Sequence, residues 1–424
     1  MNAFAGLCCS VAVANAQQWT QVGQDILGDE GHLFGRSVVL SGDGMVIATA
    51  VLLPTERSGV NIFKLTADSW STVHSFESGT EPLNPVSLAM STNGQILVVG
   101  NPSDDGCGSD ETIAICGKIT RLDSQTRADW NNGTVLQETQ AKYNFGEAVA
   151  VSSDGETLVT SAPFASYEDM NYKRGMVKVY HASSFKTAMS TFTPTGYQNL
   201  YGMSVALSGD GSTLVIGSPG SNDQIAGFVE IHTKNSTNDW SLQQTIVAGA
   251  GTDAENWRFG EAVAISTDGT TIAIGCPSYD QSGIVSPKGQ VTIYAFEQTQ
   301  WARKGDSING TTFGDYLGSA LALSEDGATI AIGAPGCFFA GLCPNIVNTS
   351  GYVRVHRFNA SAAVKWPQIG QTLMGDSAYG ASVALTSSGN TVAIGAPAHV
   401  SSDEDDYLWA NYDAGLVKVY SLPR

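Results

Sequence analysis

A unit of about 60 residues returns seven times along this chain, and a chain of such copies folds as an array. Each copy holds an apolar run, a tight turn of the form Ser-x-Asp-Gly or similar, and a second apolar run. In every copy but the first, which reads Ala50-Val51-Leu52, the second run ends in Gly-x-Pro or a relic of it. The turns begin at Ser41, Ser91, Ser152, Ser208, Ser266, Ser324 and Thr386. Any candidate function must therefore fit a repeated scaffold.

Each copy encodes four short strands. Before the turn, small and large residues alternate, as in 204–207, a period of two that is typical of a strand with one closely packed face. The turn aspartate can accept from nearby amides, and its glycine can take the left-handed conformation that ends a hairpin. A third strand then begins with glycine, and a fourth is predicted to open with tryptophan at Trp70, Trp130, Trp240, Trp301 and Trp366. Seven copies of four antiparallel strands predict an all-β fold, a seven-bladed β-propeller.

The two ends of the chain predict how the ring closes. Gly415 opens the last third strand, and too few residues follow it for a fourth strand. A strand-like segment that begins with Trp19, residues 19–24, precedes the first copy. Pairing this segment with the C-terminal three strands would complete the last blade and leave no bare sheet edge.

Composition and charge narrow the class of partner. The repeats span nearly all of 17–424, which we interpret as one propeller domain, and we expect a monomer. The net charge of −19 comes from 40 acidic and 21 basic side chains. Phosphate binding needs clustered Lys and Arg, so the charge argues against a nucleic acid partner.

Several features predict export from the cell. Residues 1–16 carry no charged side chain and end in Ala-Asn-Ala, as in a secretory signal cleaved before Gln17, although the usual basic residue is missing and a ragged tail stays open as an alternative. Beyond them no apolar stretch is long enough to span a membrane. Asn-x-Ser/Thr sequons, candidate glycosylation sites, stand at Asn132, Asn235, Asn309, Asn348 and Asn359.

Cysteine spacing agrees with an oxidising compartment. Two pairs each share one loop, which predicts the local disulfides Cys107–Cys116 and Cys337–Cys343. Neither loop offers the further ligands of a closed zinc site. Cys276 stands alone at a Gly-x-Pro position and is predicted to be a buried free thiol.

The order Phe-Gly, Gly-Ala-Pro and Gly-x-Val-x-Val-Tyr, as in 34–35, 333–335 and 415–420, resembles FG-GAP repeats, the units of the integrin α-subunit propeller. In particular the chain looks like the secreted arrays of this family found in diatoms and marine bacteria. The resemblance covers about 16–424 and implies extracellular adhesion or ligand binding without catalysis. Calcium-binding members carry a longer, aspartate-rich link between strands one and two. Calcium takes six to eight oxygen ligands, so one aspartate per turn predicts no calcium here, and we expect no cofactor.

Other motifs are weaker. The turn is similar to the Asp box of sialidase propellers, but it is one residue short and lacks the tryptophan; WD40 propellers share such turns, but their Gly-His and Trp-Asp pairs are missing. Just before the first strands, Arg36, Glu147 and Glu261 occupy equivalent places. If these side chains point into the central mouth, they could perform acid/base chemistry or hold a cation, or they could simply be wetted channel groups.

The long, variable loops predict a binding face. Propeller loops that join strands two to three and successive blades emerge on one side and commonly bind partners. Aromatic and acidic side chains there suit a glycan or a protein. The candidates are Trp257, Tyr316, Phe338, Phe339, Asp403, Asp405, Tyr407 and Trp409.

The preferred hypothesis is a secreted, non-catalytic propeller that binds an extracellular protein or a polysaccharide through this face. No histidine stands beside a nucleophile, so triad catalysis has little support. Two alternatives stay open: a glycan-active enzyme using Glu147 and Glu261, and a structural component of an extracellular matrix or cell wall.

Overall fold

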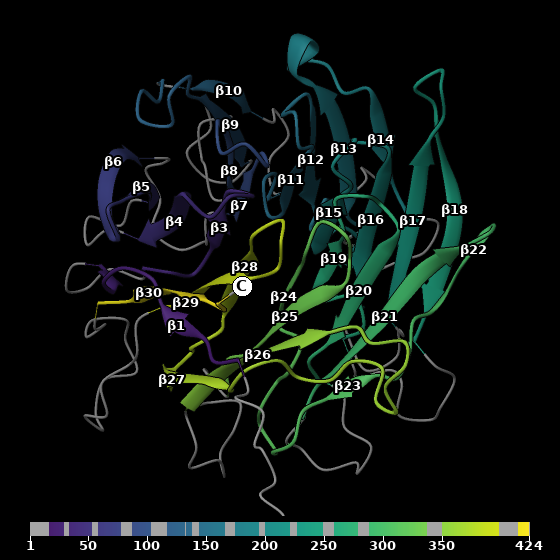
Figure 1. The fold of residues 1–424 in the computed structure, drawn as a ribbon. Coiled ribbons are helices and arrows are strands. Elements are labelled where there is room, and N and C mark those ends of the chain that lie inside the picture. Colours follow the sequence, from purple (N-terminus) through teal and green to yellow (C-terminus); the bar gives the residue numbers. More distant parts are fainter. Residues whose placement is uncertain are drawn as a thin grey trace, which may run out of the picture.

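A computed structural model shows an all-β, seven-bladed propeller, as the repeat predicts (Figure 1). It describes residues 17–28, 34–52, 58–77, 87–102, 117–131, 133–137, 144–165, 174–194, 200–220, 227–248, 258–278, 288–336, 350–397 and 414–423. Within these ranges the helical structure is a single 3-10 turn, η1 (Ala182–Ser184).

Each blade is an antiparallel sheet, and in blades 1 to 6 the strands follow one another in chain order from the ring centre outward. Blade 1 holds β3 (Val38–Leu40), β4 (Val46–Leu52), β5 (Ser58–Thr66) and β6 (Ser69–Glu77). Blade 2 holds β7 (Ser87–Met90), β8 (Ile96–Asn101), β9 (Lys118–Asp123) and β10 (Thr134–Gln137); blade 3 holds β11 (Val149–Val151), β12 (Thr157–Ala162), β13 (Met176–His181) and β14 (Ser190–Phe192). Blade 4 holds β15 (Ser204–Leu207), β16 (Thr213–Ser218), β17 (Phe228–Lys234) and β18 (Trp240–Val247). Blade 5 holds β19 (Val263–Ile265), β20 (Thr271–Cys276), β21 (Gln290–Glu297), β22 (Gln300–Arg303) and β23 (Ile308–Asn309); blade 6 holds β24 (Ala320–Leu323), β25 (Thr329–Ala334), β26 (Ser350–Arg357) and β27 (Leu373–Ser377).

Blade 7 joins the two ends of the chain and closes the ring. Its inner strands are β28 (Ser382–Leu385), β29 (Thr391–Ala396) and β30 (Leu416–Ser421), and its outer strands are the N-terminal β1 (Thr20–Gln21) and β2 (Ile26–Leu27). Thr20 pairs with Ser421, and Val22 N donates to Val419 O at 2.8 Å. Figure 1 shows purple β1 beside yellow β30. The predicted closure is confirmed.

The outer tryptophans pack between neighbouring blades. Two of them do not open a strand, although the sequence predicts that they do. β10 and β27 begin beyond Trp130 and Trp366, not at them. Both side chains are buried all the same. Trp366 Nε1 donates to Lys304 O of the preceding blade at 2.6 Å. The tryptophans recur because they fill the gap between blades, whether or not a strand begins there.

A glutamine clasps some of these tryptophans. The Gln371 side chain accepts from Trp19 N at 2.8 Å and donates to Trp19 O at 2.8 Å, while Trp19 Nε1 donates to Ile369 O at 3.1 Å. Gln244 clasps Trp301 in the same way, and Gln24 clasps Trp70. Each clasp joins the outer strands of two successive blades.

The Gly-x-Pro glycines allow blades to approach closely. A Cβ placed on Gly395 would lie 1.9 Å from Gly35 O of blade 1, so only hydrogen fits there. Ser382, at the small first position of β28, donates its hydroxyl to the same Gly35 O at 2.8 Å. Gly35 itself has a φ of +90°. The Phe-Gly and Gly-x-Pro motifs are therefore two halves of one contact between blades.

The Ser-x-Asp-Gly turns define one face of the ring, here called the turn face. In the turn at Ser324, the serine Oγ donates to Asp326 Oδ1 at 2.6 Å, and Asp326 accepts from Ala328 N. Successive turns are joined around the ring by Gly42–Thr92, Thr92–Ser153, Ser153–Gly209, Gly209–Thr267, Asp268–Glu325, Glu325–Ser387 and Ser387–Gly42 hydrogen bonds. The connections from strand three to strand four lie on this face as well, since Lys234 N donates to Ser212 O of a turn. The opposite side is called the loop-bearing face.

Candidate functional site

Arg36, just before the first strand of blade 1, and Glu147, just before the first strand of blade 3, interact electrostatically. Both residues directly follow the left-handed glycine that precedes an innermost strand, Gly35 or Gly146. Burial raises the pKa of Glu147 to about 7, and the attraction of Arg36 partly opposes this rise. Near neutral pH, the charged and the neutral form of the Glu147 carboxyl are therefore both populated.

Glu261 has a different surrounding. Arg258 Nε lies 2.7 Å from Glu261 Oε2. The Glu261 side chain is 20 % exposed, yet enough protein surrounds it that burial raises its pKa, against the pull of Arg258. Burial and the charge of Glu261 also raise the pKa of the Cys276 thiol, which is buried as predicted. The structure thus pairs Glu147 with Arg36 and Glu261 with Arg258.

Most predicted residues of the loop-bearing face lie outside the described residues. These are Trp257, Phe338, Phe339, Asp403, Asp405, Tyr407 and Trp409. The same holds for the predicted disulfide residues Cys107, Cys116, Cys337 and Cys343 and for the sequons at Asn132 and Asn348.

Tyr316 belongs to a described loop, 310–318, that enters blade 6 on the loop-bearing face. Asp315 Oδ2 holds this loop by accepting from Thr311 N at 2.9 Å, Thr312 N at 2.8 Å and the Tyr352 hydroxyl at 2.6 Å. Tyr316 has a φ of +52°, and burial raises the pKa of its phenol. The Asp315 carboxylate thus ties the start of this loop to Tyr352 of β26.

The same loop presents an aromatic side chain that sequence analysis missed. Phe313 is 41 % exposed, and Lys288 Nζ lies 4.5 Å from its ring centroid, a cation–π distance. Gly336 N, just after β25, donates to Asp315 O at 3.3 Å, which places the loop beside the connection between strands two and three. No sequence signal separates Phe313 from a core phenylalanine, because nothing in the repeat aligns with it.

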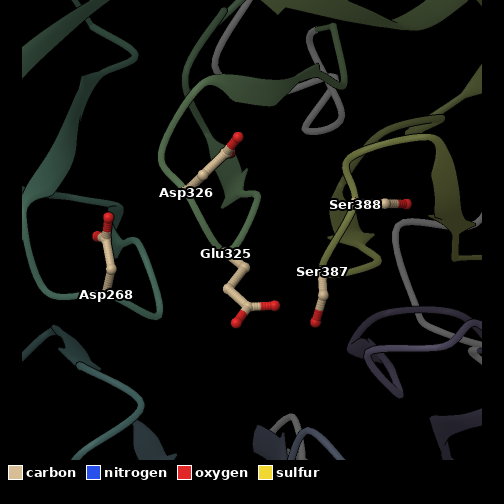
Figure 2. Close-up of a pocket in the computed structure, with 5 residues that line it drawn as sticks. All are labelled: Asp268, Glu325, Asp326, Ser387 and Ser388. Carbon is tan, nitrogen blue, oxygen red and sulfur yellow. The ribbon is translucent and has the colours of Figure 1, made fainter.

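An open hollow of about 530 Å³ lies on the turn face. It is lined by Asp268, Glu325, Asp326, Ser387 and Ser388 from the turns of blades 5, 6 and 7. Figure 2 shows the Glu325 carboxylate and the Ser387 hydroxyl pointing into the same open space. The repeat pattern predicts a structural role for these turns, and no sequence signal predicts a hollow between them.

Three of the side chains that line the hollow are acidic, and Asp326 already accepts hydrogen bonds within its own turn. Burial alone would raise the pKa of Asp326, but hydrogen bonds from Ser324 and Ala328 hold it below its usual range. Lys304 Nζ donates to Thr271 Oγ1 at 3.0 Å and to Gly327 O at 3.2 Å, and its charge acts on Asp326 as well. Across the described residues, no group of three or more Cys, His, Asp or Glu side chains is arranged to hold a metal ion.

His232 lies between blades 3 and 4. Its ring is 4.5 Å from that of Phe192, and its Nε2 lies 2.9 Å from Glu230 Oε2, which also accepts from the Tyr201 hydroxyl at 2.7 Å. Burial would raise the pKa of Glu230, but these two partners hold it low. His232 and Tyr201 are both buried, so His232 contributes to the packing between these blades.

Comparison with known proteins supports the fold. No protein-family model matches the sequence, and no curated protein matches it. Solved structures do match: the Cps50 (Swd1) β-propeller domain of Myceliophteria thermophila has a TM-score of 0.53 at 10 % identity, covering 96 % of this chain and 100 % of that one. The WD40 repeats of RRP9 have a TM-score of 0.52 at 12 % identity, with 96 % and 99 % covered, and U3-55K has 0.52 at 11 %, with 94 % and 98 % covered.

This chain is a seven-bladed β-propeller. At 10–12 % identity, the likeness to these structures, which include the WD40 repeats of RRP9, concerns the fold alone. The FG-GAP resemblance stays a prediction. Among the described residues no helix is long and apolar enough to cross a membrane.

Proposed function

We propose that this protein is a non-catalytic propeller that binds an extracellular protein or a polysaccharide through its loop-bearing face. The observation that carries the proposal is Phe313, exposed on a loop that Asp315 fixes to blades 5 and 6. A rigid aromatic side chain loses little conformational entropy on binding, and such residues anchor many interfaces. Tyr316 follows in the same loop.

The mouth carboxylates fit a structural role better than a catalytic one. A glycosidase needs two carboxyl groups that flank one bond. Here Glu147 is influenced by Arg36 and Glu261 by Arg258, so each carboxyl has a cation of its own.

The proposal also includes that the protein is exported from the cell and that its repeats are of the FG-GAP type. The support is the uncharged segment 1–16, the five sequons, and the shared order of Phe-Gly, Gly-Ala-Pro and Gly-x-Val-x-Val-Tyr. The Phe-Gly and Gly-x-Pro motifs form the contact between blades, so their spacing reflects how the ring is built.

The test compares two exposed phenylalanines on opposite faces. Phe313→Ser removes the aromatic group of the loop-bearing face, whereas Phe296→Ser changes one of similar exposure, 37 %, whose N–H bonds to Thr270 O beside the turn face. The intact protein and both variants are screened against glycan arrays and a panel of purified extracellular proteins. We expect a hit that Phe313→Ser weakens at least tenfold and Phe296→Ser leaves within twofold.

Two results would contradict the proposal. One is a confirmed ligand whose affinity falls with Phe296→Ser and not with Phe313→Ser, which would place binding on the turn face. The other is turnover of a glycan substrate that Glu147→Gln abolishes, which would establish the enzyme alternative.

A further inference from the structure

Two of the sequons occupy equivalent places in different blades. Asn235 lies in the connection from β17 to β18 of blade 4, and Asn359 lies in the connection from β26 to β27 of blade 6. The residue before each one bonds to a turn of its own blade: Lys234 N donates to Ser212 O, and Phe358 N donates to Ala328 O, both at 2.8 Å. Both asparagines are exposed at the rim of the turn face.

Local hydrogen bonds orient both side chains in the same way. Asn235 Oδ1 accepts from Thr237 N at 2.9 Å and from Asp239 N at 2.9 Å. Asn359 Oδ1 accepts from Ser361 N at 3.0 Å. In each side chain the oxygen is bound to the turn backbone, so the fold does not use the nitrogen Nδ2 for these bonds. Nδ2 is the atom that N-glycosylation modifies.

We propose that Asn235 and Asn359 carry N-linked glycans, which cover the rim of the turn face and leave the loop-bearing face open to a partner. The inference rests on the proposed export. A lipid-linked oligosaccharide pyrophosphate is the donor: a bond forms between Nδ2 and the anomeric carbon, the bond from that carbon to the pyrophosphate oxygen breaks, and Nδ2 loses one proton.

Asn309, another sequon asparagine among the described residues, lies beside the proposed binding loop and not at the turn face. It lies in β23, its Oδ1 accepts from Gln290 Nε2 at 2.8 Å, and Thr311 of its sequon accepts from Arg354 Nη2 at 3.0 Å. Thr311 N is also held by Asp315, in the loop that presents Phe313. A glycan at Asn309 would stand next to the proposed binding loop, whereas glycans at Asn235 and Asn359 stand on the other face.

Exposed apolar side chains lie near both proposed sites. Val364, 60 % exposed, belongs to the same connection as Asn359, and Leu242, 52 % exposed, lies on β18 just after the Asn235 turn. Bulky, polar sugars nearby would shield such groups from non-specific association.

The experiment maps glycans on the full chain secreted from a eukaryotic host. One form keeps residues 1–16, and a second form replaces them with an established secretory signal. Purified protein is treated with peptide N-glycosidase F, which leaves aspartate where a glycan was attached, and the peptides are read by mass spectrometry. Thr237→Val and Ser361→Ala remove one sequon each, while Thr237→Ser and Ser361→Thr preserve it.

Support requires converted aspartate at both 235 and 359, loss of one glycan in each sequon-breaking variant, and retention in each conservative variant. Unmodified peptides at both positions in the form with the established signal would overturn the inference. If that form is glycosylated and the form with residues 1–16 stays inside the cell, the proposed export fails while the glycan sites stand.

Discussion

Replacing Trp19 with alanine tests whether the chain ends hold the ring together. The Trp19 side chain is 3 % exposed and belongs to a core with Val392, Ile394 and Leu422. Burying a tryptophan removes roughly 150–250 Å² from water, and truncation of a buried large aromatic costs about 3–5 kcal/mol. The change also leaves Ile369 O without its indole donor.

The expected fall in melting temperature follows from the number of residues that the structure describes. At roughly 2 cal/mol/K per residue, the unfolding entropy of these roughly 300 residues is on the order of 0.6 kcal/mol/K. A loss of about 4 kcal/mol therefore lowers Tm by roughly 6 °C. Leu27→Ala, on the neighbouring strand but 64 % exposed, is expected to change Tm by less than about 1 °C.

A matched variant separates closure from simple loss of a core side chain. Trp301 is 4 % exposed and has an equivalent clasp from Gln244, but it lies between blades 4 and 5, far from the ends of the chain. Trp301→Ala should cost a similar amount of stability. Amide exchange in Leu416–Ser421, however, should rise with Trp19→Ala and stay unchanged with Trp301→Ala. A Trp19→Ala protein that melts within 1 °C of the wild type, with unchanged exchange in β30, would refute the closure argument.

Two further predictions concern the Glu147 carboxyl and the contact between blades at Gly395. Burial raises the pKa of Glu147 from its ordinary 4.5 to about 7, so the folded state holds a proton that the unfolded chain releases, and stability falls as pH rises between these values. Glu147→Gln should flatten this slope in urea denaturation and gain up to about 3 kcal/mol at pH 8; an unchanged slope would contradict the assignment. Gly395→Ala would place a methyl group 1.9 Å from Gly35 O. It should destabilise the fold by about 2 kcal/mol or more, and an unshifted urea midpoint would exclude the proposed close approach.

The fold could be predicted from the repeat because seven copies show the same pattern of strand-forming and turn-forming residues. Alternating small and large residues, the Asp-Gly turn and the third-strand glycine each specify one strand or turn, and agreement between copies removes accidents of any one copy. Start points of outer strands were less predictable. Trp130 and Trp366 pack between blades without opening a strand, because their burial depends on the neighbouring blade and not on local backbone pairing.

The candidate site was predictable only in part. Tyr316 was identified from its loop, but Phe313 was not, because its exposure depends on how Asp315 folds 310–318 against Tyr352. The hollow at Glu325 and Ser387 was missed for a similar reason: it forms between turns of separate copies, and each turn considered alone is a finished hairpin.

The sequence by itself determined the number of blades, the order of strands within each one and the closure at Trp19, since these depend on short-range patterns and on counting copies. Tertiary structure alone decided which charged side chains interact. Arg36, Glu147 and Glu261 occupy equivalent positions in the repeat, yet Glu147 is influenced by Arg36 whereas Glu261 pairs with Arg258 of its own loop. Position in the repeat predicts where a residue lies within its blade. Its partner depends on distances between blades and on local loop conformation, which the repeat does not specify.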